Sequence, residues 1–154
     1  MLTEPERREI AELIGQYETT RAVIPEALQV VQRQRGWVSD DAITEVAGVL
    51  ELTPDEVDSI ATFYNLIFRR PVGRHMLLVC NSVSCWIMGY PSLRDYLTAK
   101  LGIALGETTA DGRFTLLPTV CLGACDHAPA MLLDDELYGD LTPEKIDEIL
   151  AQYL

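Results

Sequence analysis

The four cysteines of this chain, Cys80, Cys85, Cys121 and Cys125, fall into two close pairs. Four residues separate the members of the first pair, three separate those of the second, and 35 residues lie between the pairs. Each pair is close enough in sequence to hold one metal atom, and a shared site forms only if the fold brings both pairs together. No other pattern in the sequence constrains the fold and the chemistry so directly.

The length and the composition describe a globular chain that is strongly acidic. At 154 residues, 48% of them hydrophobic, the chain is long enough for one compact domain together with a small helical one. Its net charge of −12 argues against binding to nucleic acid or to an anionic membrane surface, because both need a concentrated basic face. An acidic surface either keeps the protein well solvated or complements a basic partner.

The sequence also bears on where the protein works. It has no apolar run near the ~20 residues that a membrane-spanning helix needs, so we expect no direct membrane insertion. The N-terminal stretch MLTEPERREIAEL is acidic and amphipathic, unlike a secretory signal or an Arg-rich transit peptide. We therefore expect a cytoplasmic location. Because the cytosol is reducing, a metal site is favoured over two structural disulfides.

Before residue 70 the hydrophobic spacing is helical, and we expect four helices. The first has an apolar face that extends to Tyr17. Pro25 suits the first turn of the second helix, which ends near Gly36. A third helix follows, and Thr53-Pro54-Asp55-Glu56 is a capping box that begins the fourth.

After a turn at residues 69–73, the pattern changes to that of a small α/β sheet domain. The expected elements are strand 75–79, a helix opened by Pro91 and closed by Gly102, strands 113–117 and 130–133, and a final helix that starts at Thr142-Pro143. We therefore expect an α+β protein with a helical domain over residues 1–70 and a second domain over residues 71–154.

The predicted strands place both cysteine pairs in loops at one edge of the sheet. Cys80 ends the first strand and Cys85 lies in the loop that follows, whereas Cys121 and Cys125 lie in a loop between two later strands. Backbone N–H groups remain free in such loops, and Gly123 allows close approach because it has no side chain. An iron–sulfur cluster needs these conditions, since N–H donors stabilise the negative charge of its sulfurs.

Among the groups that four thiolates hold, a [2Fe–2S] cluster is favoured. Structural zinc, more often bound by C-x2-C knuckles, would make the chain a zinc-stabilised interaction module. A dithiol redox protein is disfavoured because no C-x-x-C is present, and a [4Fe–4S] cluster because the C-x2-C-x2-C run is absent. His75 and His127 could serve a Rieske-type site, but the four cysteines complete a ligand set without them.

Several other features leave alternatives open. No GxGxxG or P-loop occurs, so we expect no nucleotide site on this chain. Trp86 and Tyr90 either pack ordinarily or shield the metal site. The apolar run 63–68 either packs internally or contacts a partner. A short basic cluster is either a solvated turn or a partner contact; its members are Arg69, Arg70 and Arg74.

Two stretches carry a family resemblance. GRHMLLVCNSVSCWIMGY and DGRFTLLPTVCLGACDHAPAMLL resemble the thioredoxin-like [2Fe–2S] subunit of NADH–quinone oxidoreductase, which is the E subunit of bacterial complex I. Upstream, IPEALQVVQRQRGWVSDDAI and ATFYNLIFRRPVGRH resemble it as well. The resemblance covers the chain from about Arg21 to the last helix, and no ligand position departs from the family pattern.

The resemblance implies a thioredoxin-like domain that binds a [2Fe–2S] cluster, preceded by a helical bundle that helps to dock a partner. It also implies that Cys80 and Cys85 hold one iron and that Cys121 and Cys125 hold the other. The cluster would accept an electron from the FMN of an F-type flavoprotein subunit, which binds the NADH. That step would lie beside the main chain of clusters that leads to quinone.

On this resemblance the chain carries no catalytic residue and is an enzyme only as part of the complex. The complex would hold it peripherally on the cytoplasmic side of the inner membrane. Equivalent diaphorase subunits of NAD-linked hydrogenases and formate dehydrogenases are similar, and they remain alternatives. A free-standing ferredoxin is disfavoured, because an electron shuttle has little use for a helical docking extension.

Overall fold

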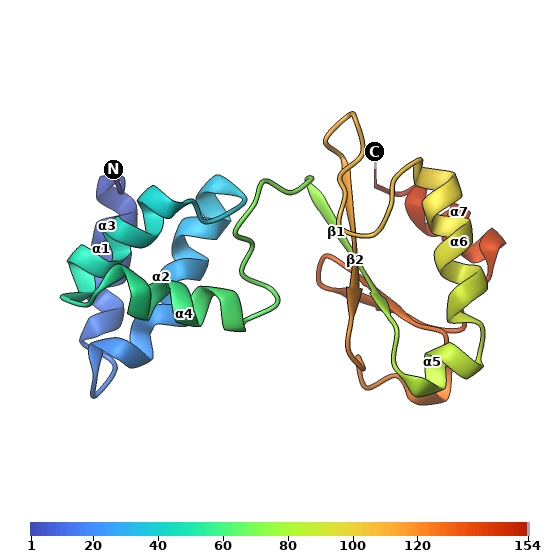
Figure 1. Ribbon diagram of the computed structural model, residues 1–154, viewed down its shortest axis with the longest axis horizontal. Coiled ribbons are helices and arrows are strands. Elements are labelled where there is room, and N and C mark those ends of the chain that lie inside the picture. The colour runs from blue at the N-terminus through green and yellow to red at the C-terminus, as the bar shows by residue number, and fades with distance from the viewer. Residues whose placement is uncertain (154) are drawn as a thin grey trace. The chain divides into compact units, whose positions relative to one another are not determined.

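A computed structural model describes residues 1–153, and their contacts divide the chain into two compact units (Figure 1). The first unit is Met1–Pro71 and the second begins at Val72. Residue 154, the last residue of the predicted second domain, lies outside the described residues. Within the part that the structure describes, no helix is long and apolar enough to cross a membrane.

The first unit is a bundle of four helices: α1 (Glu4–Ile14), α2 (Thr20–Arg35), α3 (Asp40–Leu50) and α4 (Pro54–Phe63). Three of them begin at a hydroxyl side chain that accepts a backbone N–H of the first turn, namely that of Thr3, Ser39 or Thr53. The helices pack through apolar side chains that include Ile10, Val23, Ile24, Leu28, Val31, Val46, Leu50 and Val57.

Two details predicted for the first unit are wrong. α1 ends at Ile14, so Tyr17 lies beyond it with its ring exposed. α2 begins at Thr20, which puts Pro25 at its sixth position rather than in its first turn. Because proline has no backbone N–H, Pro25 cannot donate the helical hydrogen bond to the Arg21 carbonyl, and the helix lacks that one bond. The buried residues on either side of that proline keep the helix continuous.

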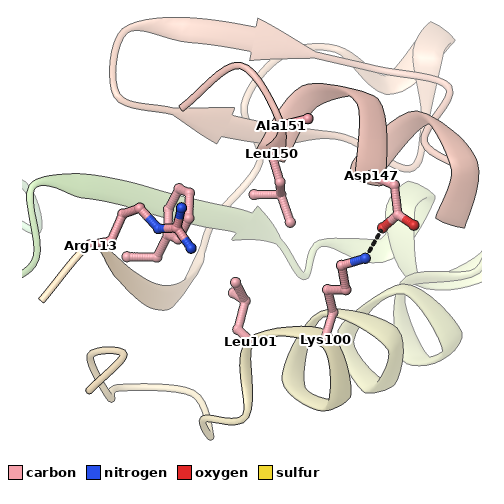
Figure 2. A pocket seen from close by; sticks show the side chains of 7 residues that line it. Lys100, Leu101, Arg113, Asp147, Leu150 and Ala151 are labelled. Atoms are coloured by element: carbon pink, nitrogen blue, oxygen red, sulfur yellow. Dashed lines mark ion pairs between the residues drawn. The ribbon is translucent and has the colours of Figure 1, made fainter. Parts of the chain in front are cut away.

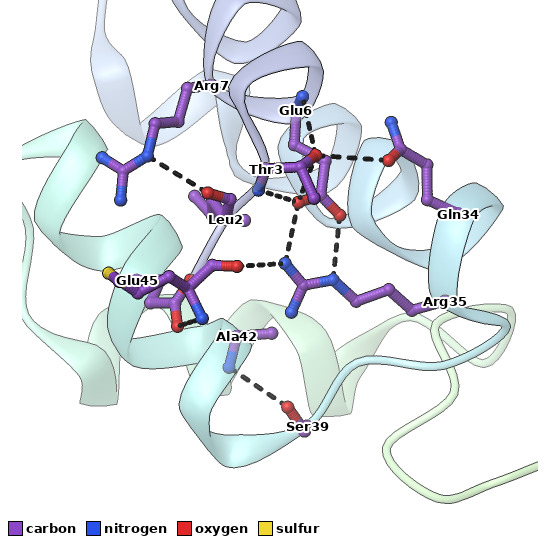
Figure 3. Close-up of polar contacts among 10 residues, drawn as sticks. Leu2, Thr3, Glu6, Arg7, Gln34, Arg35, Ser39, Ala42 and Glu45 are labelled. Carbon is purple, nitrogen blue, oxygen red and sulfur yellow. Dashed lines mark hydrogen bonds and ion pairs between the residues drawn. The ribbon is translucent and has the colours of Figure 1, made fainter.

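A buried carboxylate ties α1 to the end of α2. The Glu6 side chain is 0% exposed, and its two oxygens accept hydrogen bonds from Nε and Nη2 of Arg35 at 2.9 and 2.7 Å (Figure 3). One of them also accepts the Thr3 backbone N–H at 2.6 Å. Burial alone would raise the pKa of Glu6, but the hydrogen bonds from Arg35 and Thr3 outweigh it and hold the pKa below its ordinary value.

We expect Glu6→Gln to destabilise the protein by about 1–3 kcal/mol, because Arg35 loses its charged partner. The folded-state pKa of Glu6 lies below the unfolded value of 4.5, so the contribution of the pair is present above that pH and is lost as pH falls through the folded pKa. Urea denaturation of both proteins, repeated as pH is lowered from about 7 to about 3, should show the gap between them narrowing.

Glu9→Gln is the matched control, since Glu9 lies on the same helix. Its pair with Arg33 is exposed, with 46% and 60% of the two side chains accessible. We expect a change below about 1 kcal/mol. Equal losses in the two variants, or a Glu6→Gln loss that does not depend on pH, would contradict this account.

The second unit is built on a mixed sheet in the order β2-β1-β3-β4. Its strands are β1 (His75–Cys80), β2 (Phe114–Thr119), β3 (Met131–Leu133) and β4 (Glu136–Tyr138). β1 runs parallel to β2 and antiparallel to β3, and β4 is antiparallel to β3. The strands contribute apolar side chains to the core of this unit, among them Leu77, Val79, Phe114, Leu116, Met131 and Leu133.

Two helices, α6 (Tyr90–Leu101) and α7 (Pro143–Leu150), lie side by side on the same side of the sheet (Figure 1). The short helix α5 (Val83–Ile87) connects β1 to α6. Parallel strands need a crossover connection of this kind, because a tight turn can join only antiparallel neighbours.

Asp147 of α7 joins the two helices. Its carboxylate accepts the Tyr96 hydroxyl of α6 at 2.7 Å and pairs with Lys100 at 3.0 Å. Figure 2 shows this ion pair at the rim of a pocket, whose apolar lining includes Leu101, Phe114 and Leu150. The contact therefore joins α6 to α7 beside this pocket.

The predicted α+β class is confirmed, because helices and a mixed sheet make up the chain. The sequence did not reveal α5 or β4. α5 has five residues and β4 has three, so neither is long enough to show a hydrophobic period. The missed α5 matters most, since the structure places Cys85 on it rather than in a loop.

Candidate metal centre

The parallel pairing of β1 with β2 brings the two cysteine pairs to one place. Cys80 is the last residue of β1 and lies opposite Thr119, the last residue of β2. Cys121 follows β2 by two residues, and Cys85 follows β1 on α5. Because the C-terminal ends of parallel strands meet at the same edge of a sheet, the segments that leave them start side by side.

The thiols of Cys121 and Cys125 are in contact. Their Sγ atoms lie 3.4 Å apart, and Cys80 and Cys85 belong to the same buried cluster of side chains. The structure thus places all four predicted site residues on the two segments that leave this edge of the sheet.

The two pairs differ in burial. Cys80 and Cys85, the inner pair, are each 2% exposed and belong to the core of the second unit. Cys121 and Cys125, the outer pair, are exposed. A metal group held by all four thiols would therefore have one side in the core and the other at the surface.

The pKa values of Cys121 and Cys85 are shifted in opposite directions. The Gly123 N–H donates to Cys121 Sγ at 3.4 Å and lowers the pKa of that thiol. Gly123 has a φ of 81°, a left-handed conformation that glycine adopts without strain. Burial, together with Cys80, raises the pKa of Cys85 to about 11. A metal that binds Cys85 therefore has to displace a proton.

The two histidines are engaged elsewhere. His75 begins β1, at the end opposite Cys80, and its Nδ1 lies 2.7 Å from Oδ2 of Asp134. His127 lies two residues after Cys125, with its Nδ1 2.8 Å from Oδ2 of Asp140. Each ring thus has a carboxylate partner.

The aromatic and basic candidates separate into packed and exposed residues. Tyr90 is buried, whereas Trp86, whose ring centroid lies 5.5 Å from that of Tyr90, remains 53% exposed. In the first unit, Arg69 pairs with Asp58 at 2.9 Å and with Asp40 at 2.6 Å, so the charge of this arginine is used within the unit. Three large apolar side chains of the run 63–68 are exposed: Phe63, Tyr64 and Leu66.

The arrangement of donors fits a group with two metal atoms. A [2Fe–2S] cluster needs four thiolates, two for each iron, and N–H donors beside its sulfurs. The four cysteines on the two adjoining segments and the Gly123 N–H beside Cys121 are of these kinds.

A model of the thioredoxin-like [2Fe–2S] ferredoxin family matches residues 10–154. The chain belongs to this family. The predicted [2Fe–2S] cofactor is thereby confirmed, and the zinc alternative loses its support. The assignment of the four cysteines as the ligands remains a prediction.

Two bacterial relatives are similar to this ferredoxin family member over nearly its whole length. The NADH-quinone oxidoreductase E subunit of Pseudomonas aeruginosa is 49% identical over 154 residues, 100% of this chain and 93% of that protein. The E subunit of Escherichia coli is 50% identical over 152 residues, 99% of this chain and 92% of that protein. The predicted resemblance to these E subunits is therefore confirmed.

A solved structure of an NAD+-reducing [NiFe]-hydrogenase in the air-oxidised state is similar as well. It gives a TM-score of 0.69 at 27% sequence identity. The match covers 87% of this chain but 22% of the hydrogenase chain. The likeness therefore concerns one part of a much longer protein.

We expect Cys121→Ser and Cys125→Ser to lose the cluster or to perturb it severely, because serine is a harder and far less acidic ligand. Iron should fall well below the about two atoms per chain of a full [2Fe–2S] site. Iron analysis, with EPR after dithionite reduction, measures this. Ser82→Ala is the control, since Ser82 lies in the same segment and its side chain makes no capping bond. An unchanged iron content and EPR signal in either cysteine variant would refute the ligand assignment.

Proposed function

We propose that this chain is the electron-transfer subunit of an NADH–quinone oxidoreductase. In this proposal Cys80 and Cys85 hold one iron of its [2Fe–2S] cluster, and Cys121 and Cys125 hold the other. The observation that carries the proposal is the register of β1 and β2, which brings two cysteine pairs to one sheet edge with one pair buried and the other exposed. The identity of about half of all residues with the E subunits of two bacteria supports the same function.

The residues of the site position the cluster, and they perform no acid–base or nucleophilic chemistry. The bound cluster supplies one-electron chemistry. The inner pair fixes one side of the site in the core, the outer pair brings the other side to the surface, and the Gly123 N–H stabilises negative charge at the Cys121 sulfur. An electron donor would therefore approach from the side of the outer pair.

The surface beside the outer pair suits a protein partner. Val83, Trp86, Ile87 and Met88, which we call the α5 surface, are between 53% and 75% exposed. Val120, directly before Cys121, is 72% exposed. Exposed apolar patches of this kind mark interaction sites. We infer that the F-type flavoprotein subunit, which binds FMN and NADH, covers the α5 surface.

The same proposal gives the two parts of the chain separate roles. The helical domain, residues 1–70, would help to dock the complex, and the thioredoxin-like domain, residues 71–154, would hold the cluster. The division of contacts after Pro71 supports this assignment. The chain would lie on the cytoplasmic side of the inner membrane, held there by the other subunits of the complex.

A diaphorase subunit of an NAD-linked hydrogenase is the second candidate. Its support is the likeness to the NAD+-reducing hydrogenase, at a TM-score of 0.69 and 27% identity. The two bacterial E subunits are considerably more similar, at 49% and 50% identity over nearly the whole chain. The respiratory complex is therefore the preferred assignment.

We expect NADH to reduce the cluster only when the FMN-loaded flavoprotein subunit is present. Trp86→Glu should slow this reduction about tenfold or more at limiting partner concentration, because a carboxylate in an apolar contact loses at least about 1.4 kcal/mol of binding. The measurement is the EPR signal of the cluster-loaded chain, frozen at intervals after NADH is added to the mixture.

Leu137→Glu is the matched control, since Leu137 lies on β4 of the same unit and is 49% exposed. It should react as the unsubstituted chain does. Reduction by NADH without the flavoprotein would overturn the division of labour between the subunits. Equal rates of cluster reduction in the Trp86→Glu and Leu137→Glu variants would show that the flavoprotein subunit does not bind at the α5 surface.

A further inference from the structure

The outer cysteine Cys125 begins a short turn of 3-10 helix, η1 (Cys125–His127). The turn is closed by the His127 N–H, which donates to the Ala124 carbonyl at 3.1 Å. Cys125 is exposed, so the core does not enclose it as it encloses the inner pair. The position of its sulfur therefore depends on what holds the two ends of this turn.

Asp140 holds the end of the turn at two points. Its backbone N–H donates to the His127 carbonyl at 2.6 Å, and Oδ2 of its carboxylate lies 2.8 Å from Nδ1 of the His127 ring. An ionised carboxylate only accepts hydrogen bonds, so Nδ1 is the donor in the second contact. We call these two contacts the His127–Asp140 clasp.

The segment that carries Asp140 is itself fixed on both sides. Leu141 is buried in the core of the second unit, and its N–H donates to the Pro129 carbonyl at 3.2 Å. Before Asp140, the Gly139 carbonyl accepts a hydrogen bond from Nζ of Lys145 on α7 at 2.6 Å. The clasp therefore ties the exposed turn to a segment that the core and α7 hold in place.

We propose that His127 and Asp140 are positioning residues, whose clasp fixes the turn that begins at Cys125 and so holds the exposed half of the ligand set. This inference rests on the proposed cluster and its four ligands. Groups that orient a metal ligand without binding the metal help to retain the metal. Iron leaves only when its ligands move away, and surface segments open more readily than the core. The clasp should therefore slow the loss of iron through the outer pair.

The experiment measures how fast the cluster-loaded chain and its variants release iron to an excess of EDTA, with EPR spectra recorded after dithionite reduction. We expect His127→Ala to release iron about twofold to fivefold faster, the range that one exposed contact of this kind provides. Its EPR signal should broaden or change its g values, because the sulfur of Cys125 is held less firmly. A loss of stability alone would not change the spectrum of the intact cluster.

Conservative substitutions separate the hydrogen bond from the side chain. His127→Asn places an amide N–H near the position of Nδ1 and should retain iron as the unsubstituted chain does. Asp140 has a φ of 49°, which asparagine and glycine both tolerate. Asp140→Asn keeps an acceptor oxygen and should retain iron, whereas Asp140→Gly should behave as His127→Ala. Because both residues act through one contact, the double variant His127→Ala, Asp140→Gly should release iron no faster than either single variant.

His75→Ala is the matched control. It also removes a ring whose Nδ1 contacts an aspartate, at 2.7 Å from Oδ2 of Asp134, but it does so at the end of β1 opposite Cys80. We expect it to lower the stability of the second unit and to leave the EPR signal of the cluster unchanged.

Each other outcome also decides the matter. An EPR signal that His127→Ala leaves unchanged, or that His75→Ala changes equally, would overturn the inference. Unaltered iron release from both His127→Ala and Asp140→Gly would do the same. Failure of His127→Ala to bind iron would support the clasp if His127→Asn binds it, and would reject the clasp if His127→Asn also fails. An unsubstituted chain that binds no iron would reject the proposed function, and this inference with it.

Discussion

The parallel pairing of β1 with β2 is the constraint on which the site depends. It sets Cys80 opposite Thr119, so that the two segments carrying the remaining cysteines leave the sheet side by side. A slip of one residue would turn every side chain of a strand to the other face of the sheet. Leu77, Phe114 and Leu116 are buried, and this burial fixes the register. The apolar core therefore positions the two segments that carry the cysteines.

An electron carrier has to hold its metal group in a fixed position and also let a partner approach it. Burial of one cysteine pair and exposure of the other meet both requirements. The core holds the inner pair in place and keeps water from it, which raises the pKa of Cys85. The outer pair lies at the surface, next to apolar side chains that a partner can cover. Gly123 supplies a hydrogen-bond donor on this outer side. The buried cysteines on β1 and α5 would thus attach a metal group to the core, and the exposed cysteines after β2 would leave it accessible to a partner.

The long helices and the metal–thiolate chemistry could be predicted from the sequence, because each leaves a local pattern of residues. Capping residues such as Thr53 mark helix starts, and the cysteine spacing points to a metal–thiolate group. α5 leaves no such signal at five residues, so Cys85 was assigned to a loop. The burial difference between the pairs arises from tertiary packing, which leaves no local signal in the sequence. The start of α2 was predicted too late, because Pro25 was placed in the first turn. Pro25 instead lies inside the helix, where the buried apolar residues around it keep the helix continuous.

Mössbauer spectroscopy of the chain loaded with 57Fe, before and after dithionite, tests the central claim most directly. Iron, zinc and acid-labile sulfide are to be measured on the same sample. The account predicts about two iron and about two sulfide per chain, a diamagnetic oxidised state with two ferric sites, and one ferric and one ferrous site with an S = 1/2 EPR signal after reduction. About one zinc per chain, with no iron and no EPR signal, would contradict it and would make the four cysteines a structural metal site.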